Sequence, residues 1–175
     1  MASFKGLDIR PTSDRVREAI FDLLGHELSG EKVLDLFAGT GSLGIEALSR
    51  GAACALFLDY SPKALELIKK NLHLCRLEAL GFALRKDLLK GLPFRHHMLE
   101  EKMDLVFVDP PYRKSMIPPV LQELSDRNIL ESNAILVAQS EHRETLPPRV
   151  RSLQTVQSRA YGETRITIYH HEGHE

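Results

Sequence analysis

Short apolar runs alternate along the chain with amphipathic stretches of helical spacing. A near-continuous apolar run indicates a strand buried on both faces, as in a parallel sheet, because a strand with one solvated face alternates instead. The pattern predicts five such strands, the third being the weakest: residues 33–37, 54–59, 81–86, 104–109 and 134–138. Between and before them it predicts four helices: residues 12–24, 42–50, 61–72 and 118–127.

The end of the chain changes character. Residues 151–158 and 164–169 look extended, and the pair Tyr161-Gly162 lies between them, which is typical of a β-hairpin. We therefore predict an α/β fold in one domain over residues 1–175, with one leading helix and a terminal antiparallel hairpin.

Composition narrows the class of protein. Hydrophobic residues make up 43% of the 175 residues, which excludes a wholly disordered chain, and no apolar run approaches the ~18 residues of a membrane span. Two cysteines, Cys54 and Cys75, argue against a disulfide framework, so we expect a cytoplasmic protein. The net charge of −1 means that any nucleic-acid-binding surface must be local.

A glycine-rich loop follows the first predicted strand. Gly39, Gly41 and Gly44 have the spacing G-x-G-x-x-G between a strand and a helix, where glycines permit a tight turn and close approach to a ligand. Asp59 follows Gly39 by 20 residues at the end of the next strand, and there a carboxylate can accept both hydroxyls of a ribose. The loop therefore predicts a cofactor that contains a nucleoside.

Acidic residues near the strand ends help to distinguish S-adenosylmethionine (SAM) from a dinucleotide as the cofactor. A dinucleotide presents a pyrophosphate to the helix N-terminus, whereas SAM presents an ammonium and a sulfonium. Asp35 lies inside the strand before the glycines, where an anion suits a cation better than a pyrophosphate. Asp87, after the third strand, is placed to accept from an adenine amino group. These residues favour SAM over NAD.

The motif Asp109-Pro-Pro-Tyr112 ends the fourth predicted strand, at the ligand-binding edge of an open α/β sheet. Its prolines remove two N–H donors, so the Asp109 carboxylate and the Pro110 carbonyl form an acceptor-rich corner. An exocyclic amine can donate to both acceptors while its ring stacks on Tyr112. This arrangement predicts methyl transfer to an amine, a reaction that depends mainly on positioning.

Four segments together resemble a known family: residues 10–18 (R-P-T-S-D-R-V-R-E), 34–47, 108–112 and 161–162. They are similar to the bacterial small-subunit (16S) ribosomal RNA guanine-N2 methyltransferases, within the class I SAM-dependent methyltransferases. The resemblance runs from about Arg10 to Tyr169. It implies a Rossmann-like, mostly parallel seven-stranded sheet with a C-terminal antiparallel hairpin and helices on both faces.

The resemblance also implies roles for particular residues. It makes Asp109, Pro110 and Tyr112 the catalytic corner and SAM the cofactor, with no metal. The residues expected beside SAM are Asp35, Phe37, Ala38, Gly39, Gly41, Asp59, Ser61, Asp87 and Leu88. The basic residues expected near the RNA are Arg10, Arg15, Arg17, Arg113 and Lys114.

The substrate that the resemblance implies is a guanine of 16S ribosomal RNA in an assembling small ribosomal subunit, with no membrane partner. Only nine residues precede Arg10, so we expect the N-terminal arm usual in the family to be short or trimmed.

Other functions compete with this interpretation. Related enzymes methylate N6 of adenine or a glutamine amide in protein, often with Asn where Asp109 stands. An NAD-dependent dehydrogenase would explain the glycines and Asp59 but would leave Asp35 and Asp109-Pro-Pro-Tyr112 without a role. A SAM-binding RNA module without catalysis is the non-enzymatic alternative, against which the intact Asp109-Pro-Pro-Tyr112 argues.

Overall fold

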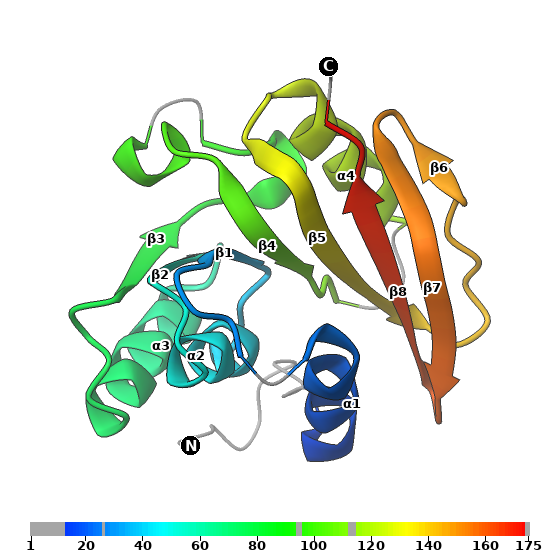
Figure 1. The fold of residues 1–175 in the computed structure, drawn as a ribbon. Coiled ribbons are helices and arrows are strands. Elements are labelled where there is room, and N and C mark those ends of the chain that lie inside the picture. The colour runs from blue at the N-terminus through cyan, green and yellow to red at the C-terminus, as the bar shows by residue number, and fades with distance from the viewer. Residues whose placement is uncertain (1–12, 26, 94–95, 112–114, 174–175) are drawn as a thin grey trace.

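A computed structural model describes residues 13–25, 27–93, 96–111 and 115–173. One mixed sheet of eight strands runs through this part of the chain in the order β3-β2-β1-β4-β5-β8-β7-β6 (Figure 1). The strands are β1 Lys32–Leu36, β2 Cys54–Asp59, β3 Gly81–Arg85, β4 Met103–Val108, β5 Leu130–Glu141, β6 Arg149–Val150, β7 Leu153–Tyr161 and β8 Thr164–His171. The α-helices are α1 Asp14–Leu24, α2 Ser42–Ser49, α3 Pro62–Leu74 and α4 Ile117–Asp126.

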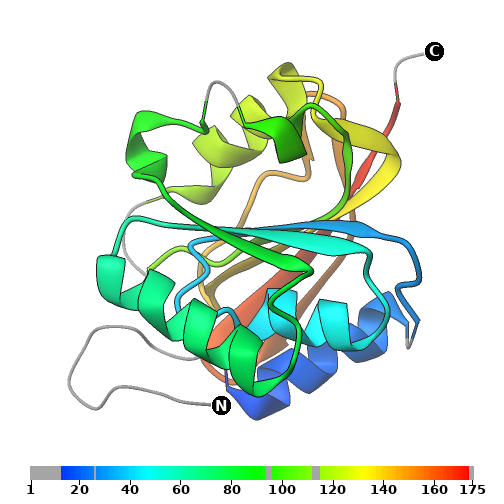
Figure 2. The same cartoon turned by 90° about the vertical axis from the view of Figure 1, so that its left-hand side faces the viewer.

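The first five strands pair in parallel, and β8 lies antiparallel between β5 and β7. Figure 2 shows helices on both sides of the sheet, with α1, α2 and α3 on one face and α4 on the other. Each face has its own apolar core: Ile20 and Phe57 belong to the first, Leu121 and Leu136 to the second. The prediction of an α/β fold with a mostly parallel sheet, a terminal hairpin and helices on both faces is confirmed.

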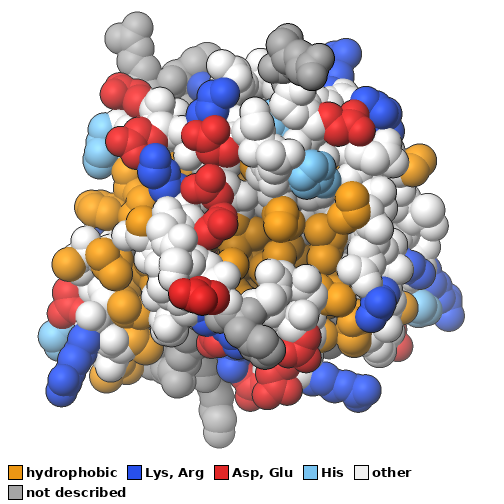
Figure 3. Space-filling model, in the orientation of Figure 1, with side chains coloured by type: hydrophobic (Ala, Val, Ile, Leu, Met, Phe, Trp, Pro, Cys, Tyr) orange, Lys and Arg blue, Asp and Glu red, His pale blue; other side chains and the backbone are white. Residues whose placement is uncertain are grey.

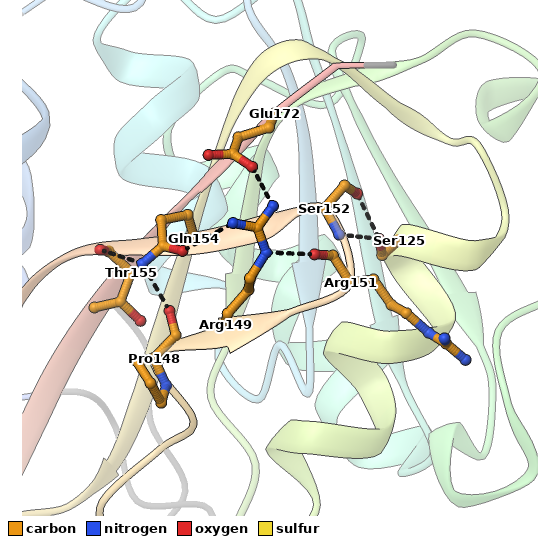
Figure 4. A network of polar contacts seen from close by, with 8 residues as sticks. All are labelled: Ser125, Pro148, Arg149, Arg151, Ser152, Gln154, Thr155 and Glu172. Carbon is orange, nitrogen blue, oxygen red and sulfur yellow. Dashed lines mark hydrogen bonds and ion pairs between the residues drawn. The ribbon is translucent and has the colours of Figure 1, made fainter.

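The predicted strand count of seven is wrong by one short strand. Arg149 and Val150 form β6, which pairs with the beginning of β7 around a turn where Arg151 has a φ of 55°. Figure 4 shows what holds this edge: the Arg149 guanidinium donates to the Glu172 carboxylate and to the Arg151 carbonyl. Two residues carry too little periodicity to be recognised as a strand in the sequence.

The helix ends follow from local chemistry. The Ser13 side chain accepts from the Val16 N–H at 3.3 Å and begins α1, and Gly25, with a φ of 94°, follows its last residue. Ser61 begins α3, with Pro62 in its first turn. Within the described ranges, no helix has both the length and the apolar character to cross a membrane.

Candidate functional site

The glycine loop turns the chain from β1 into α2 at the carboxyl edge of the parallel strands. Phe37, Gly39 and Gly41 all have left-handed φ angles, 59°, 55° and 75°. The Gly41 N–H donates to the Ala38 carbonyl at 2.7 Å, which closes the turn. A left-handed conformation is easy for glycine but costly for phenylalanine, and such strain collects at ligand-binding sites.

The third glycine of the motif serves packing. A Cβ on Gly44 would lie 2.3 Å from Cε1 of Phe57 and 3.1 Å from Oδ2 of Asp35. Only a residue without a side chain lets α2 approach β2 this closely. Gly44 therefore fixes the position of the helix, while Gly39 and Gly41 shape the loop.

Asp59 holds the loop from the end of β2. Its Oδ2 accepts from the Gly39 N–H and its Oδ1 from the Ser61 N–H, both at 2.9 Å. A carboxylate has about four lone-pair sites, so two remain for hydroxyls of a ligand. Ser61 itself uses its side chain to accept from the Ala64 N–H at 3.4 Å.

Asp35 is a buried carboxylate on β1. Its Oδ2 accepts from the Gly44 N–H at 3.0 Å. Burial raises the pKa of Asp35 well above its usual range, and the nearby charges of Asp109 and Asp59 raise that pKa further, against the lowering effect of the Gly44 hydrogen bond. The structure thus brings three acids from β1, β2 and the end of β4 into electrostatic contact.

The acceptor-rich corner follows β4. The Asp109 N–H donates to the Leu36 carbonyl at 3.4 Å, which ties the corner to the neighbouring strand β1. Pro110 is buried and Pro111 is exposed. Tyr112, the third predicted catalytic residue, lies outside the described residues.

The predicted adenine side lies after β3. Asp87 accepts from the Leu89 N–H at 3.1 Å and forms an ion pair with Lys90 at 3.7 Å, while Leu88 is buried. Tyr60, which the sequence interpretation missed, is 69% exposed directly after Asp59. An aromatic residue immediately after the acidic residue of a nucleoside-binding motif was the signal available.

Of the five predicted RNA-contact residues, the structure describes two, Arg15 and Arg17. Arg15 is exposed on α1. Arg17 forms ion pairs with Asp14 at 2.9 Å and Glu46 at 3.8 Å, so its guanidinium already has carboxylate partners. The remaining predicted contacts lie outside the described residues: Arg10, Arg113 and Lys114.

Gln139 is a second residue that the sequence interpretation missed. Because Val108 and Ala138 are register partners in the parallel pair β4–β5, Gln139 lies level with Asp109. Its side chain is buried at 3% exposure, and its Nε2 has no hydrogen-bond partner among the described residues. Buried donors are rarely left unpaired, so an orphan beside the corner suggests a ligand that supplies the acceptor. A polar residue ending an apolar strand was the only sequence signal.

Comparison with known proteins adds independent findings. A family model described as conserved hypothetical protein 95 matches residues 1–170. The chain is 35% identical to "Putative rRNA methyltransferase YlbH" of Bacillus subtilis, over 96% of this chain and 91% of that protein. It is 30% identical to "Ribosomal RNA small subunit methyltransferase D" of Escherichia coli K12, over 94% and 80%.

A solved structure shares the fold. "Putative methyltransferase yhhF from Escherichia coli" has a TM-score of 0.82 and 28% identity, over 99% of this chain and 92% of that one.

Proposed function

The chain belongs to the family of conserved hypothetical protein 95, and from this premise we propose that it is a SAM-dependent methyltransferase acting on the N2 amine of a guanine in 16S ribosomal RNA. The names of its relatives in Bacillus subtilis and Escherichia coli, both for ribosomal RNA methylation, support the substrate class. The N2 position and the specific roles of the site residues are our proposal from the resemblance and the local chemistry.

The observation that carries the proposal is the meeting of Asp35, Asp59 and Asp109 at one edge of the sheet. Burial disfavours the charge of Asp35, and the nearby charges of Asp109 and Asp59 disfavour it further, as the raised pKa of Asp35 records. A cationic ligand removes this penalty, whereas a pyrophosphate would increase it. The donor set therefore fits SAM and does not fit NAD.

Each residue near the glycine loop then has a role toward SAM. The remaining lone pairs of Asp59 accept the ribose hydroxyls, and Asp35 lies on the side of the ammonium. The exposed ring of Tyr60 covers one face of the adenine, and Asp87 with Leu88 borders its edge. When bound, SAM supplies an electrophilic methyl group.

The corner after β4 positions the target amine. The Asp109 carboxylate and the Pro110 carbonyl each accept one N–H of the guanine amine, which aims its nitrogen lone pair toward the cofactor. Tyr112 stacks on the base. A guanine in a duplex or packed loop hides its amine, so the base is flipped out of the RNA before it enters the corner.

The orphan amide of Gln139 extends this recognition to the base itself. Its Nε2 needs an acceptor at the level of Asp109. In guanine, the N3 atom lies next to the amine-bearing carbon and is an acceptor. An Nε2–N3 hydrogen bond pairs the buried donor and adds one contact to the ring of the base.

The test is methylation of ribosomal RNA by purified protein, followed by mass spectrometry of digested RNA. We expect N2-methylguanine from 16S RNA and a loss of about 100-fold or more in rate for Asp109→Ala, because small misplacements of reacting groups already cost that much. Asp22→Ala, which changes an exposed aspartate on α1, is the matched control and should keep the parent rate. N6-methyladenine as the product would refute the substrate, and full turnover by Asp109→Ala would refute the mechanism.

A further inference from the structure

Residues 60–90, together with His96 and His97, form a surface that we call the β3 edge. β3 is the outermost strand on this side of the sheet. Figure 2 shows it nearest the viewer, with α3 along one side. The RNA contacts expected from the sequence, Arg10, Arg15, Arg17, Arg113 and Lys114, belong to other segments of the chain.

The β3 edge is basic in a chain that is not. It holds seven of the chain's 23 Lys and Arg but only three of its 24 Asp and Glu. Six of the seven cations make no ion pair with any residue that the structure describes; the exception is Lys90, which pairs with Asp87. An uncompensated local cluster of this kind attracts an anionic partner.

The same surface exposes apolar side chains. Across the described ranges, six large hydrophobic side chains are exposed, and five of them lie here: Tyr60, Leu74, Leu80, Phe82 and Leu89. In Figure 3, which has the orientation of Figure 1, a row of Asp and Glu side chains runs beside a central apolar area. The combination of exposed apolar groups and cations is therefore a local property of the β3 edge.

A groove of about 360 Å³ crosses the β3 edge. The residues that line it include Lys69 of α3, Glu78, Phe82 of β3 and His96. The Phe82 ring, on a side chain 42% exposed, meets the His97 ring edge-on with centroids 6.2 Å apart, and His97 stacks on His96 at 4.6 Å. The groove thus offers aromatic surfaces beside a lysine, and its volume lies in the usual range of ligand sites, about 300–1,000 Å³.

The groove is connected to the candidate active site through β3. Arg85 is the register partner of Asp59, and its Nε donates to the Tyr60 carbonyl at 3.1 Å. Phe82 lies three residues earlier, about 10 Å along the strand at ~3.3 Å per residue. A polymer that enters the active site can therefore continue along the β3 edge to the groove.

We propose that the β3 edge binds single-stranded RNA flanking the target nucleotide, with one unpaired base stacked on Phe82 in the groove and its phosphates near Lys69, Lys70 and Lys86. Proteins that hold single strands combine a positively charged track with aromatic platforms in this way. The presence of aromatic rings beside a lysine favours RNA over an acidic protein segment, which would not need stacking surfaces. This inference rests on the proposed RNA substrate and names where that RNA is held.

The test measures binding of a short fluorescein-labelled single-stranded RNA by fluorescence anisotropy over a range of KCl concentrations. Phe82→Ala should weaken binding about 5-fold or more, and Phe82→Trp should retain the parent affinity because it keeps a ring. Lys69→Glu should lower the salt slope by about 0.7 for the lost phosphate contact. SAM affinity, measured by calorimetry, should stay the same in all three variants.

Matched controls change the same kind of side chain elsewhere: Val156→Ala for the exposed apolar residue and Lys102→Glu for the charge. If Phe82→Ala and Lys69→Glu bind RNA as these controls do, the inference is wrong. If instead both variants lose binding to a poly-glutamate peptide while RNA binding is unchanged, the partner is an acidic protein and the RNA assignment is overturned.

Activity separates this inference from the proposed function. If the parent protein methylates RNA and the Phe82→Ala and Lys69→Glu variants have the same KM for RNA, the proposed function is supported and RNA binding by the β3 edge is refuted. If the parent protein methylates no RNA but the Phe82→Ala variant binds RNA more weakly than the parent, the proposed function is refuted and RNA binding by the β3 edge is supported.

Discussion

Asp59 connects the stability of the glycine loop to cofactor binding, and the substitution Asp59→Asn tests both. The carboxylate accepts from the Gly39 and Ser61 N–H groups, one with each oxygen, at 2.9 Å. An asparagine side chain has one acceptor oxygen, so in the variant its NH₂ group must face one of these two N–H groups. Asp59→Ala would remove both anchors at once and would confound loop collapse with the loss of ribose contacts.

The expected magnitude follows from this count. One hydrogen bond to a charged acceptor is lost at a site only 9% exposed, and such a bond contributes about 1.5–3 kcal/mol. At about 2–4 °C per kcal/mol for a domain of this size, the melting temperature should fall by about 3–12 °C. If Asp59 accepts the ribose hydroxyls as proposed, SAM affinity should fall about 10-fold or more, because a charged acceptor is replaced by a neutral one.

The assay is differential scanning calorimetry of the ligand-free protein, with isothermal titration of SAM below the melting range. Asp126→Asn is the control, since Asp126 forms an exposed ion pair with Arg151, which contributes at most about 1 kcal/mol. An unchanged melting temperature would refute the loop anchoring, and unchanged SAM affinity in the folded variant would refute the ribose assignment.

Three further changes have defined outcomes. Gly44→Ala places a methyl group 2.3 Å from the Phe57 ring, so calorimetry should show a loss of about 1–3 kcal/mol, and an unchanged melting temperature would contradict the packing role. Because the folded-state pKa of Asp35 lies above its unfolded value, the free energy of unfolding should fall as pH rises through and beyond about 3.9 toward that folded pKa. Asp35→Asn removes this pH-dependent loss of stability, so urea titrations at neutral pH should show a variant more stable than the parent. The variant should also bind SAM more weakly. If the free energies of unfolding of parent and variant change with pH in parallel, the role given to the Asp35 charge is wrong. Arg15→Ala should lower the salt slope of RNA binding by about 0.7. If the variant keeps the parent's slope, Arg15 does not contact a phosphate.

Much of the fold follows from local signals. Four of the five parallel strands, β1, β2, β4 and β5, carry buried apolar runs, and the weakest run belongs to β3, which lies at the sheet edge with no buried residue. The cofactor loop begins where the first run meets glycines. Where the signal was weak, the prediction was incomplete: β5 extends over 12 residues although only its apolar centre was recognisable, and β6 was missed. A strand's ends are set by pairing with neighbours such as β8, which local composition does not encode.

The sequence by itself determined which chemical groups reach the carboxyl edge of the sheet, because the strand-ending positions of Asp59 and Asp109 are readable from the apolar runs before them. Only the tertiary structure decided how those groups interact. It uses two acceptor sites of Asp59 on the loop, pairs Arg17 with Asp14 and Glu46, and buries Gln139 with no described residue as a partner for its Nε2. It also gathers the cations of residues 60–90 around the outermost strand. Burial, pairing and desolvation depend on residues far apart in the chain, and these contacts exist only once the sheet has assembled.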